Sequence, residues 1–177
     1  MTERGLLNHG SLIAVDGLGA AGKSSFADQL AERAHGAVVR VDDLSQPGVL
    51  PWEIGRFLSQ VVEPLTRGCQ ARYRRWHWTT NTPSDWLEVP TGVPVILEGV
   101  RSTDAADLAA FDLRIWLEVP EQVRVDRARR RDPDRFSCWT SNWMPQEASW
   151  AAEQQPVRRA DLVVDYLPTD ERLPQLS

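Results

Sequence analysis

The chain has 177 residues, of which 42% are hydrophobic, and this length predicts one domain with a buried core, with or without a lid. The net charge of −5 argues against a protein dedicated to nucleic acid, which would usually be basic. No apolar run approaches the roughly 20 residues of a membrane span, no signal peptide precedes residue 12, and Cys69 and Cys138 lack metal-binding spacing. We therefore expect a cytoplasmic protein with reduced thiols that binds neither nucleic acid nor membranes, and homo-oligomerisation stays open.

Short apolar runs alternate with segments of helical period along the chain. The apolar runs, which predict strands, lie at residues 11–15, 37–41, 93–97, 113–119 and 160–164. Helices are predicted at residues 23–35, 52–66, 103–110, 120–131 and 145–154. Gly36 is placed to end the first helix, and Pro51 and Pro64 stand near the two ends of the second. Residues 69–92 are rich in arginine and tryptophan and fit neither period, so we expect them to be irregular.

The alternation of strands and helices predicts an α/β fold with a parallel sheet and right-handed crossovers. No repeat, low-complexity segment or long linker divides the chain. We expect a single domain over residues 1–177, with a core at 11–165, tails at 1–10 and 168–177, and a lid region at about 120–140.

Residues 17–24 read GLGAAGKS and match the pattern G-x-x-x-x-G-K-[ST] at every fixed position, between a predicted strand and a predicted helix. Gly17, Gly19 and Gly22 are expected to adopt backbone angles that a side chain would forbid, which lets successive amide groups turn inward around phosphate. The helix that follows adds the positive end of its dipole. The predicted nucleotide-binding residues are Gly17, Gly19, Ala20, Ala21, Gly22, Lys23, Ser24 and Ser25.

Lys23 is the only lysine among the 20 Lys and Arg residues of the chain. Its ammonium group is a compact point charge that can reach β- and γ-phosphates, whereas an arginine guanidinium is wider and planar. The Ser24 hydroxyl can bind a Mg²⁺ ion that bridges those phosphates. The loop therefore predicts ATP or another nucleoside triphosphate together with Mg²⁺, and it does not by itself predict the fate of the γ-phosphate.

Acidic residues follow two of the predicted strands. Asp42 and Asp43 come after the second strand, at the edge that also carries the phosphate loop in a parallel sheet. A carboxylate there can accept the proton of a hydroxyl that attacks phosphorus, or the pair can cap the next turn. Glu98 follows the third strand and can hold a water bound to Mg²⁺, or it can be a solvated strand-end carboxylate. The pattern predicts a functional role for at least one of the two aspartates and a metal role for Glu98.

Arginines are concentrated at residues 124–131, RVDRARRR. On a helix, Arg124, Arg127 and Arg131 share a face, and they can close over a triphosphate and neutralise the charge that spreads in the transition state. The alternative is a solvated basic face. Spacing alone does not choose among these arginines, and we predict Arg127 and Arg131 as the functional pair.

Residues 72–86, RYRRWHWTTNTPSDW, mix aromatic, basic and amide side chains. Such a surface suits a planar, hydroxylated ligand, because rings can stack on it and polar groups can orient it. The tryptophans can equally serve to bury a long insertion. The predicted substrate contacts in this segment are Tyr73, Trp76, His77 and Trp78, and a lone histidine such as His77 is more often structural than catalytic.

The motifs IAVDGLGAAGKSS, VVRVDDL, RYRRWHW, VILEGV, WLEVP and RVDRARRRD occur in the order and rough spacing of uridine kinase-like P-loop kinases. The chain resembles this family over about residues 11–165. The resemblance implies a five-stranded parallel sheet flanked by helices, an arginine lid, and transfer of the ATP γ-phosphoryl group to a ribose 5′-hydroxyl.

The resemblance also assigns roles to single residues. It implies Lys23 and Ser24 as phosphate and Mg²⁺ residues, Asp42 as the base toward the acceptor hydroxyl, Glu98 as the strand-end acid, and Arg127 and Arg131 as lid residues. The chain departs from the family pattern in two places. Leu44-Ser45 stands where the family often has an aromatic pair, and Trp76-His77-Trp78 replaces a pattern with a central acid. Both departures concern the acceptor.

Three functions fit these observations. The first is a kinase that phosphorylates a nucleoside such as uridine or cytidine. The second is a P-loop kinase for another hydroxylated metabolite or for a nucleoside monophosphate, for which Arg72, Arg74 and Arg75 can supply arginines near the acceptor. The third is a nucleotide-dependent regulatory module, although the chain has no N-K-x-D motif of the kind that reads guanine in GTPases.

Overall fold

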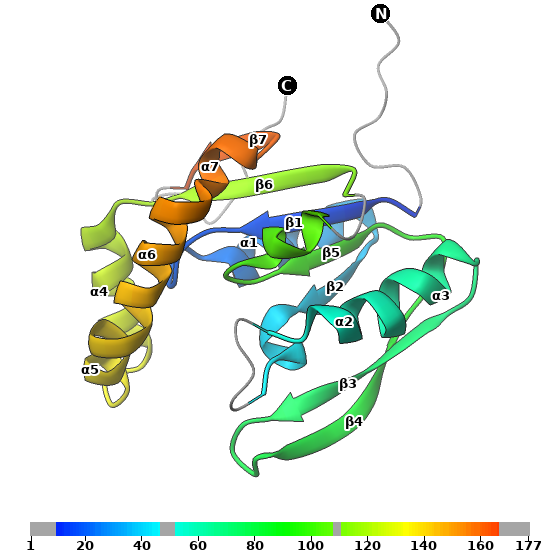
Figure 1. The fold of residues 1–177 in the computed structure, drawn as a ribbon, viewed down its shortest axis with the longest axis horizontal. Coiled ribbons are helices and arrows are strands. Elements are labelled where there is room, and N and C mark those ends of the chain that lie inside the picture. Colours follow the sequence, from blue (N-terminus) through cyan, green and yellow to red (C-terminus); the bar gives the residue numbers. More distant parts are fainter. Residues whose placement is uncertain (1–9, 47–51, 108–110, 167–177) are drawn as a thin grey trace, which may run out of the picture.

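The computed structural model describes residues 10–46, 52–107 and 111–166 of the chain. Five parallel strands form one sheet in the order β2-β5-β1-β6-β7 (Figure 1). The strands are β1 (Leu12–Asp16), β2 (Ala37–Arg40), β5 (Val95–Glu98), β6 (Leu113–Glu118) and β7 (Leu162–Asp165). The predicted α/β fold with a parallel sheet is confirmed.

The order of the strands places β1 in the centre of the sheet. Both β5 and β6 pair with it in parallel, so Val15 lies between Glu98 and Ile115. On β2, Arg40 pairs in register with Glu98. Parallel strands end at a common edge, and Asp16, Glu98 and Arg40, at the ends of β1, β5 and β2, therefore all lie at that edge.

Helical segments connect these strands. They are α1 (Lys23–Ala34), η1 (Val41–Leu44), α2 (Ile54–Phe57), η2 (Leu58–Val62), α3 (Glu63–Thr66), η3 (Ser102–Asp107), α4 (Glu121–Arg131), α5 (Phe136–Cys138), η4 (Trp139–Trp143), α6 (Met144–Gln154) and α7 (Pro156–Arg159). The segments α2, η2 and α3 follow one another without a break, as do α5, η4 and α6, and η2 and η4 are π turns within these runs. In Figure 1, α4, α5 and α6 stand at the carboxyl ends of the strands.

Two apolar clusters cover the two faces of the sheet. On one face, α1 buries Phe26 and Leu30 against strand residues that include Ile96. On the other face, the α2–α3 run buries Phe57 against residues that include Leu97. Neighbouring residues of β5 thus point to opposite clusters, and strands buried on both faces read as continuous apolar runs. This is why the sequence pattern locates them.

The segment expected to be irregular forms a second sheet, so that expectation is wrong. It contains β3 (Ala71–His77) and β4 (Thr82–Val89), which pair antiparallel as a hairpin. Ala71 and Tyr73 are buried while Arg72 between them is exposed, but the register shifts between Arg74 and Trp76. This bulge breaks the two-residue period on which strand prediction depends. In Figure 1 the hairpin lies beyond the α2–α3 run, away from β6 and β7.

Other predicted elements are found with shifted ends. The first helix ends at Ala34, and His35, with φ 51°, takes the left-handed position expected of Gly36. Gly36 has a different role, since a Cβ there would lie 2.7 Å from the Pro94 carbonyl oxygen. The second helix begins at Ile54 and Pro64 lies within it, whereas Pro51 lies outside the described residues.

The remaining predicted helices also differ from expectation in extent. The helix expected at 103–110 is the 3₁₀ segment η3, and residues 108–110 lie outside the described part. The helix expected at 145–154 begins earlier, at Phe136. Residues 1–9 of the expected N-terminal tail and the whole expected C-terminal tail, residues 168–177, also lie outside the described part. Within residues 10–46, 52–107 and 111–166, no helix has the length and apolar character needed to cross a membrane.

Candidate active site

The phosphate loop begins at a buried carboxylate, that of Asp16. Its Oδ1 accepts hydrogen bonds from the backbone amides of Gly17 at 2.7 Å and Arg101 at 2.9 Å. Its Oδ2 accepts from the amide and hydroxyl of Thr103 at 3.0 Å and 2.5 Å. Burial raises the pKa of Asp16, and the hydrogen bonds and the Lys23 charge oppose that rise. Asp16 therefore ties the start of the loop to the segment that follows β5.

The backbone of the loop turns at Gly17 with φ 152°, at Ala20 with φ 62° and at Gly22 with φ 94°. The expectation of a backbone angle that favours glycine is thus confirmed for Gly17 and Gly22, but it is wrong for Gly19. A Cβ at Gly19 would lie 2.8 Å from an oxygen of Glu147, so a larger residue there would require that side chain to move. Ala20 carries a left-handed angle that costs an L-residue about 1–2 kcal/mol. Strain of this kind is concentrated at functional sites.

Lys23, the first residue of α1, is buried against the loop. Its Nζ donates a hydrogen bond to the Leu18 carbonyl at 3.0 Å. Burial lowers the pKa of Lys23, and nearby carboxylates oppose this effect; in decreasing order they are Asp16, Glu147, Glu98 and Asp42. Burial thus disfavours the charged ammonium form, and further negative charge beside it, such as a phosphate, would favour that form.

Ser24 and Glu98 place two oxygen donors side by side. The Ser24 hydroxyl donates to Glu98 Oε1 at 3.1 Å. Glu98 is buried, and the same oxygen accepts from Arg40 at 2.8 Å, while Arg40 also pairs with Asp28 at 2.7 Å. Mg²⁺ takes few protein oxygens and fills its shell with water and phosphate, so this donor set fits the ion. Among the described residues, no group of three or more His, Cys, Asp or Glu could hold a metal.

An acidic side chain outside the predicted set lies on the phosphate loop. Glu147 of α6 accepts a hydrogen bond from the Gly19 amide at 2.6 Å. The carboxylate oxygen stands in for an oxygen of a phosphate, so this amide is already oriented to bind an anion. Burial raises the pKa of Glu147, and the Gly19 amide, Lys23 and Arg124 oppose the rise. The contact shows that the loop can bind an anionic group through this amide.

Arginines of α4 contact the opposite side of the loop backbone. Arg127 donates to the Ala21 carbonyl at 2.9 Å, and its guanidinium lies 5.7 Å from the centre of the Tyr166 ring. Arg124 is buried and donates to the Gly19 carbonyl at 3.3 Å. These bonds tie α4 to the carbonyl groups of the loop.

The two arginines predicted as the functional pair differ in their contacts with the loop. Arg127 contacts the loop, whereas Arg131 is exposed at the last turn of α4. The second loop contact on this helix comes from Arg124, which the sequence analysis does not choose. Ser25, the last residue of the predicted nucleotide set, is exposed in the first turn of α1.

The two aspartates of η1 have different environments. Asp42 is exposed, and the negative charge of its carboxylate raises the pKa of Lys23. Asp43 is half-buried and accepts a hydrogen bond from the Tyr73 hydroxyl at 3.2 Å. Burial raises the pKa of Asp43, and Arg75 and the Tyr73 hydroxyl oppose the rise. Tyr73 itself is 2% exposed, and burial together with Asp43 raises its pKa. Its visible role is to hold Asp43 from within the core.

The predicted substrate contacts of the hairpin also have different hydrogen-bond partners. Trp78 is 49% exposed, and its indole N–H donates to the backbone carbonyl of Asp42 at 3.2 Å. This bond joins the end of the hairpin to η1. The ring of His77 pairs through Nδ1 with the Thr80 hydroxyl at 3.0 Å, within the turn between β3 and β4. Trp78 is thus close to Asp42, while His77 has a structural partner.

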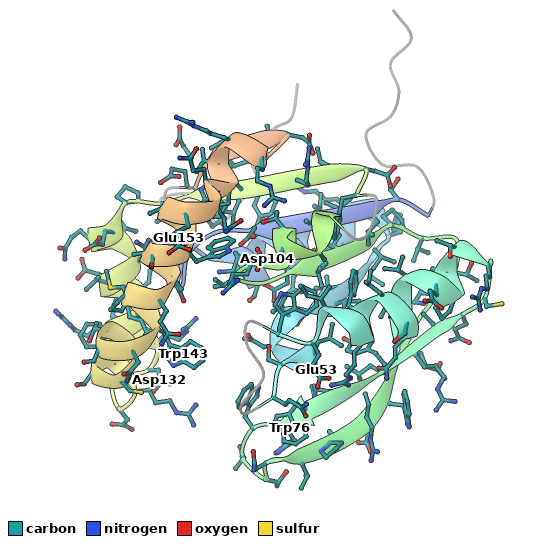
Figure 2. The ribbon with its side chains drawn as sticks, viewed as in Figure 1. Glu53, Trp76, Asp104, Asp132, Trp143 and Glu153 are labelled. Carbon is teal, nitrogen blue, oxygen red and sulfur yellow. The ribbon has the colours of Figure 1, made fainter. Side chains whose placement is uncertain are left out.

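A recess of about 220 Å³ lies between the α2 run and the hairpin. Its lining residues are Gln46, Glu53, Arg56, Gln60, Arg74, Arg75, Trp76, Pro83 and Trp86. Within the described residues, Trp76 Nε1 and Glu53 Oε2 are buried without a hydrogen bond, although Arg56 forms an ion pair with Glu53 at 3.0 Å. Figure 2 shows Glu53 and Trp76 on this side of the molecule. Buried polar atoms usually have partners, so Trp76 Nε1 is a candidate ligand contact, whereas Glu53 Oε2 already has Arg56 as its partner.

Known structures share this fold. The chain is similar to a possible uridine kinase from Bacillus stearothermophilus, with 19% identity, a TM-score of 0.59 and 88% of each chain covered. It is also similar to the shikimate kinase from Aquifex aeolicus, with 16% identity, a TM-score of 0.46 and coverage of 87% of this chain and 85% of that one. No protein-family model and no curated protein matches the chain. The fold is that of P-loop kinases, and at these identities the similarity extends to the fold alone.

Sequence reasoning missed four residues of this site. Asp16, Arg40, Glu53 and Glu147 were not assigned, and each acts through a contact with a residue far away in the chain or through burial. Only Asp16 had a local signal, since it directly precedes the first glycine of the loop. The positions of the other three depend on how the segments pack.

Proposed function

We propose that the protein is a phosphotransferase that moves the γ-phosphoryl group of ATP to a hydroxyl of a small molecule, with Mg²⁺ as cofactor. The observation that carries this proposal is the position of Asp42. Its carboxylate is exposed at the carboxyl edge of the sheet and interacts electrostatically with Lys23. A carboxylate near a phosphate-binding lysine is what proton removal from an attacking hydroxyl requires.

In this reaction the loop amides and Lys23 hold the phosphates, and Ser24 and Glu98 would hold Mg²⁺. The ion supplies charge neutralisation on the terminal phosphates when it is bound. Asp42 accepts the proton of the acceptor hydroxyl as the hydroxyl oxygen forms its bond to phosphorus. The bond between phosphorus and the bridging oxygen breaks, and ADP leaves with that electron pair.

We assign Arg127 and Arg131 to a lid that covers the transferring group. Arg127 is supported by its contact with Ala21 of the loop. Arg131 is supported by its exposed position on the same helix, from which a closing movement can bring its charge to the phosphates. Such arginines stabilise the negative charge that spreads over the phosphoryl oxygens.

The leading acceptor is the 5′-hydroxyl of a nucleoside such as uridine or cytidine. Trp78 offers a flat ring close to Asp42, and Trp76, which lines the recess, offers a second ring and a buried N–H donor. A nucleoside has a flat base and ribose hydroxyls that match both features. The similarity in fold to a possible uridine kinase agrees with this choice.

A second candidate acceptor is a nucleoside monophosphate. Arg74 and Arg75 line the recess, and the positive charge of Arg75 lowers the pKa of Asp43. Two arginines there can bind a phosphate group on the acceptor. Arg72, the third arginine considered for this role, instead lies 5.1 Å from the centre of the Trp86 ring.

An acceptor screen tests the proposal. Purified protein is first titrated with ATP and Mg²⁺ by calorimetry, with Lys23→Met as the variant expected not to bind. ADP formation and product mass are then measured with the four ribonucleosides and their 5′-monophosphates. We expect transfer to at least one pyrimidine nucleoside; transfer to monophosphates alone would favour the second candidate. No transfer to any acceptor by protein that binds ATP would contradict both.

A further inference from the structure

A carboxylate of the chain itself occupies the phosphate loop. Glu147 Oε2 accepts the hydrogen bond of the Gly19 amide at 2.6 Å. The Trp139 ring lies over the same residue, because a Cβ placed on Gly19 would lie 2.9 Å from Trp139 Nε1. Both side chains come from the unbroken helical run α5–η4–α6, which stands beside the carboxyl ends of the strands (Figure 1).

The π turn η4 brings Trp139 and Glu147 together. In a regular α-helix, residues eight positions apart point about 80° away from each other. The wider turn over Trp139–Trp143 changes that rotation, and both side chains reach Gly19. Turns of this kind occur frequently at functional sites. The placement of Glu147 thus depends on an irregularity in the helix.

The helical run is anchored independently of Glu147. The Trp150 indole, 5% exposed, donates to Asp104 Oδ1 at 3.0 Å. Its ring packs against Trp116 with 6.3 Å between the ring centres. Glu147 precedes this anchor by three residues, so a packed part of the helix carries the carboxylate to the loop.

The charges around Glu147 are those that a phosphate would meet. Lys23 and Arg124 both stabilise the Glu147 carboxylate, and Asp16 opposes it. Lys23 is in turn affected more strongly by Glu147 than by Asp42. The carboxylate and the phosphates of a nucleotide would therefore require the same amide group and the same ammonium group.

We propose that Glu147 is an internal competitor for the phosphate loop. Its carboxylate must leave the Gly19 amide before the phosphates of a nucleotide can bind there. This inference rests on the proposed binding of a nucleotide by the loop. Because the loop is competent only while the carboxylate is displaced, the affinity for every anion that needs this amide falls by the same factor.

Calorimetric titration of Glu147→Gln tests this with two ligands in the presence of Mg²⁺, ATP and inorganic triphosphate. The substitution keeps the size of the side chain and removes its charge, and inorganic triphosphate has no base or ribose to contact other parts of the site. We expect the Kd of each ligand to fall about tenfold, because a charged hydrogen bond no longer competes. Glu153→Gln is the matched control, since Glu153 is exposed on the same helix (Figure 2) and both Kd values should stay unchanged.

Several results would overturn the inference. The first is that Glu147→Gln binds both ligands with unchanged or lower affinity. The second is that its affinity rises for ATP but not for inorganic triphosphate. The third is that Glu153→Gln shows the same rise in affinity as Glu147→Gln. Glu147→Asp provides a second variant with a shorter side chain, for which we expect a gain in the same direction in protein that circular dichroism shows to be folded. Failure of the proposed function is distinguishable, because then neither the wild type nor any variant binds ATP or triphosphate.

Discussion

The two halves of the candidate site differ in how completely their polar groups are paired. On the phosphate side, Asp16 accepts four hydrogen bonds, and the Gly19 amide and Lys23 both have partners within the chain. On the acceptor side, Trp76 Nε1 is buried without a hydrogen bond among the described residues. The phosphate side thus has internal partners for its binding groups, whereas the acceptor side has a buried donor that a ligand could satisfy.

This difference indicates where stability and where specificity reside. A side chain whose partners lie within the protein contributes mainly to the free energy of folding, and its removal leaves buried groups unpaired. A buried donor or acceptor without a partner contributes little to folding and can contribute to ligand recognition. We therefore expect variants on the phosphate side to change mainly the free energy of unfolding, and variants on the acceptor side to change mainly the binding of the acceptor.

The largest expected effect concerns the chemical step. Asp42→Asn removes the proposed proton acceptor and should lower kcat by roughly 10²–10⁴-fold, while the Kd for ATP stays unchanged. Steady-state kinetics with the acceptor found by screening, together with calorimetry, measures both quantities. Asp85→Asn, an exposed aspartate of the hairpin, is the control. A kcat like that of the wild type would exclude Asp42 as the base.

The next largest effect concerns stability. Asp16→Ala removes a carboxylate with four donors and should lower the free energy of unfolding by roughly 3–5 kcal/mol. Trp78→Ala, at a half-exposed position on the acceptor side, should change it by about 1 kcal/mol or less. Urea unfolding of both variants measures the contrast. Equal losses in the two variants would show that the halves do not differ in this respect.

A smaller effect should distinguish binding from folding at the recess. Trp76→Phe keeps an aromatic ring and removes the indole N–H, so we expect the acceptor KM to rise about tenfold. The free energy of unfolding should stay the same or increase slightly, because a buried donor without a partner is lost. If the acceptor KM is unchanged, then Trp76 Nε1 does not contact the acceptor.

The smallest effect concerns strain within the phosphate loop. Ala20→Gly relieves the left-handed angle of φ 62° and should raise the free energy of unfolding by roughly 0.5 kcal/mol, since the greater freedom of glycine in the unfolded chain offsets part of the gain. Thermal unfolding of the variant measures this change. A clear loss of stability would mean that the Ala20 methyl group has favourable contacts that exceed the strain.

The sequence predicts the parts of this site that depend on neighbours in the chain. Residues 17–24 form a phosphate loop through local geometry, and the strands of the sheet are marked by apolar runs. The contacts of Glu147 with Gly19 and of Asp16 with Thr103 join residues 128 and 87 positions apart, and no local pattern marks them.

Irregular backbone geometry explains why other elements were not predicted from the sequence. The hairpin was missed because the register shift between Arg74 and Trp76 interrupts the alternation of buried and exposed residues. The π turn at Trp139–Trp143 has no known signature in residue types, so neither the early start of that helix nor the position of Glu147 could be predicted.

The hydrogen bonds of Asp16 also bear on the order of folding. They join β1 to residues 85 and 87 positions later, so the loop reaches its final shape only after β5 and η3 have docked. Closing a chain segment of this length costs entropy, so these contacts depend on the β1–β5 pairing that brings the two segments together. A nucleotide would therefore recognise a nearly complete fold, and its binding would raise the melting temperature of the whole domain rather than stabilise an early intermediate.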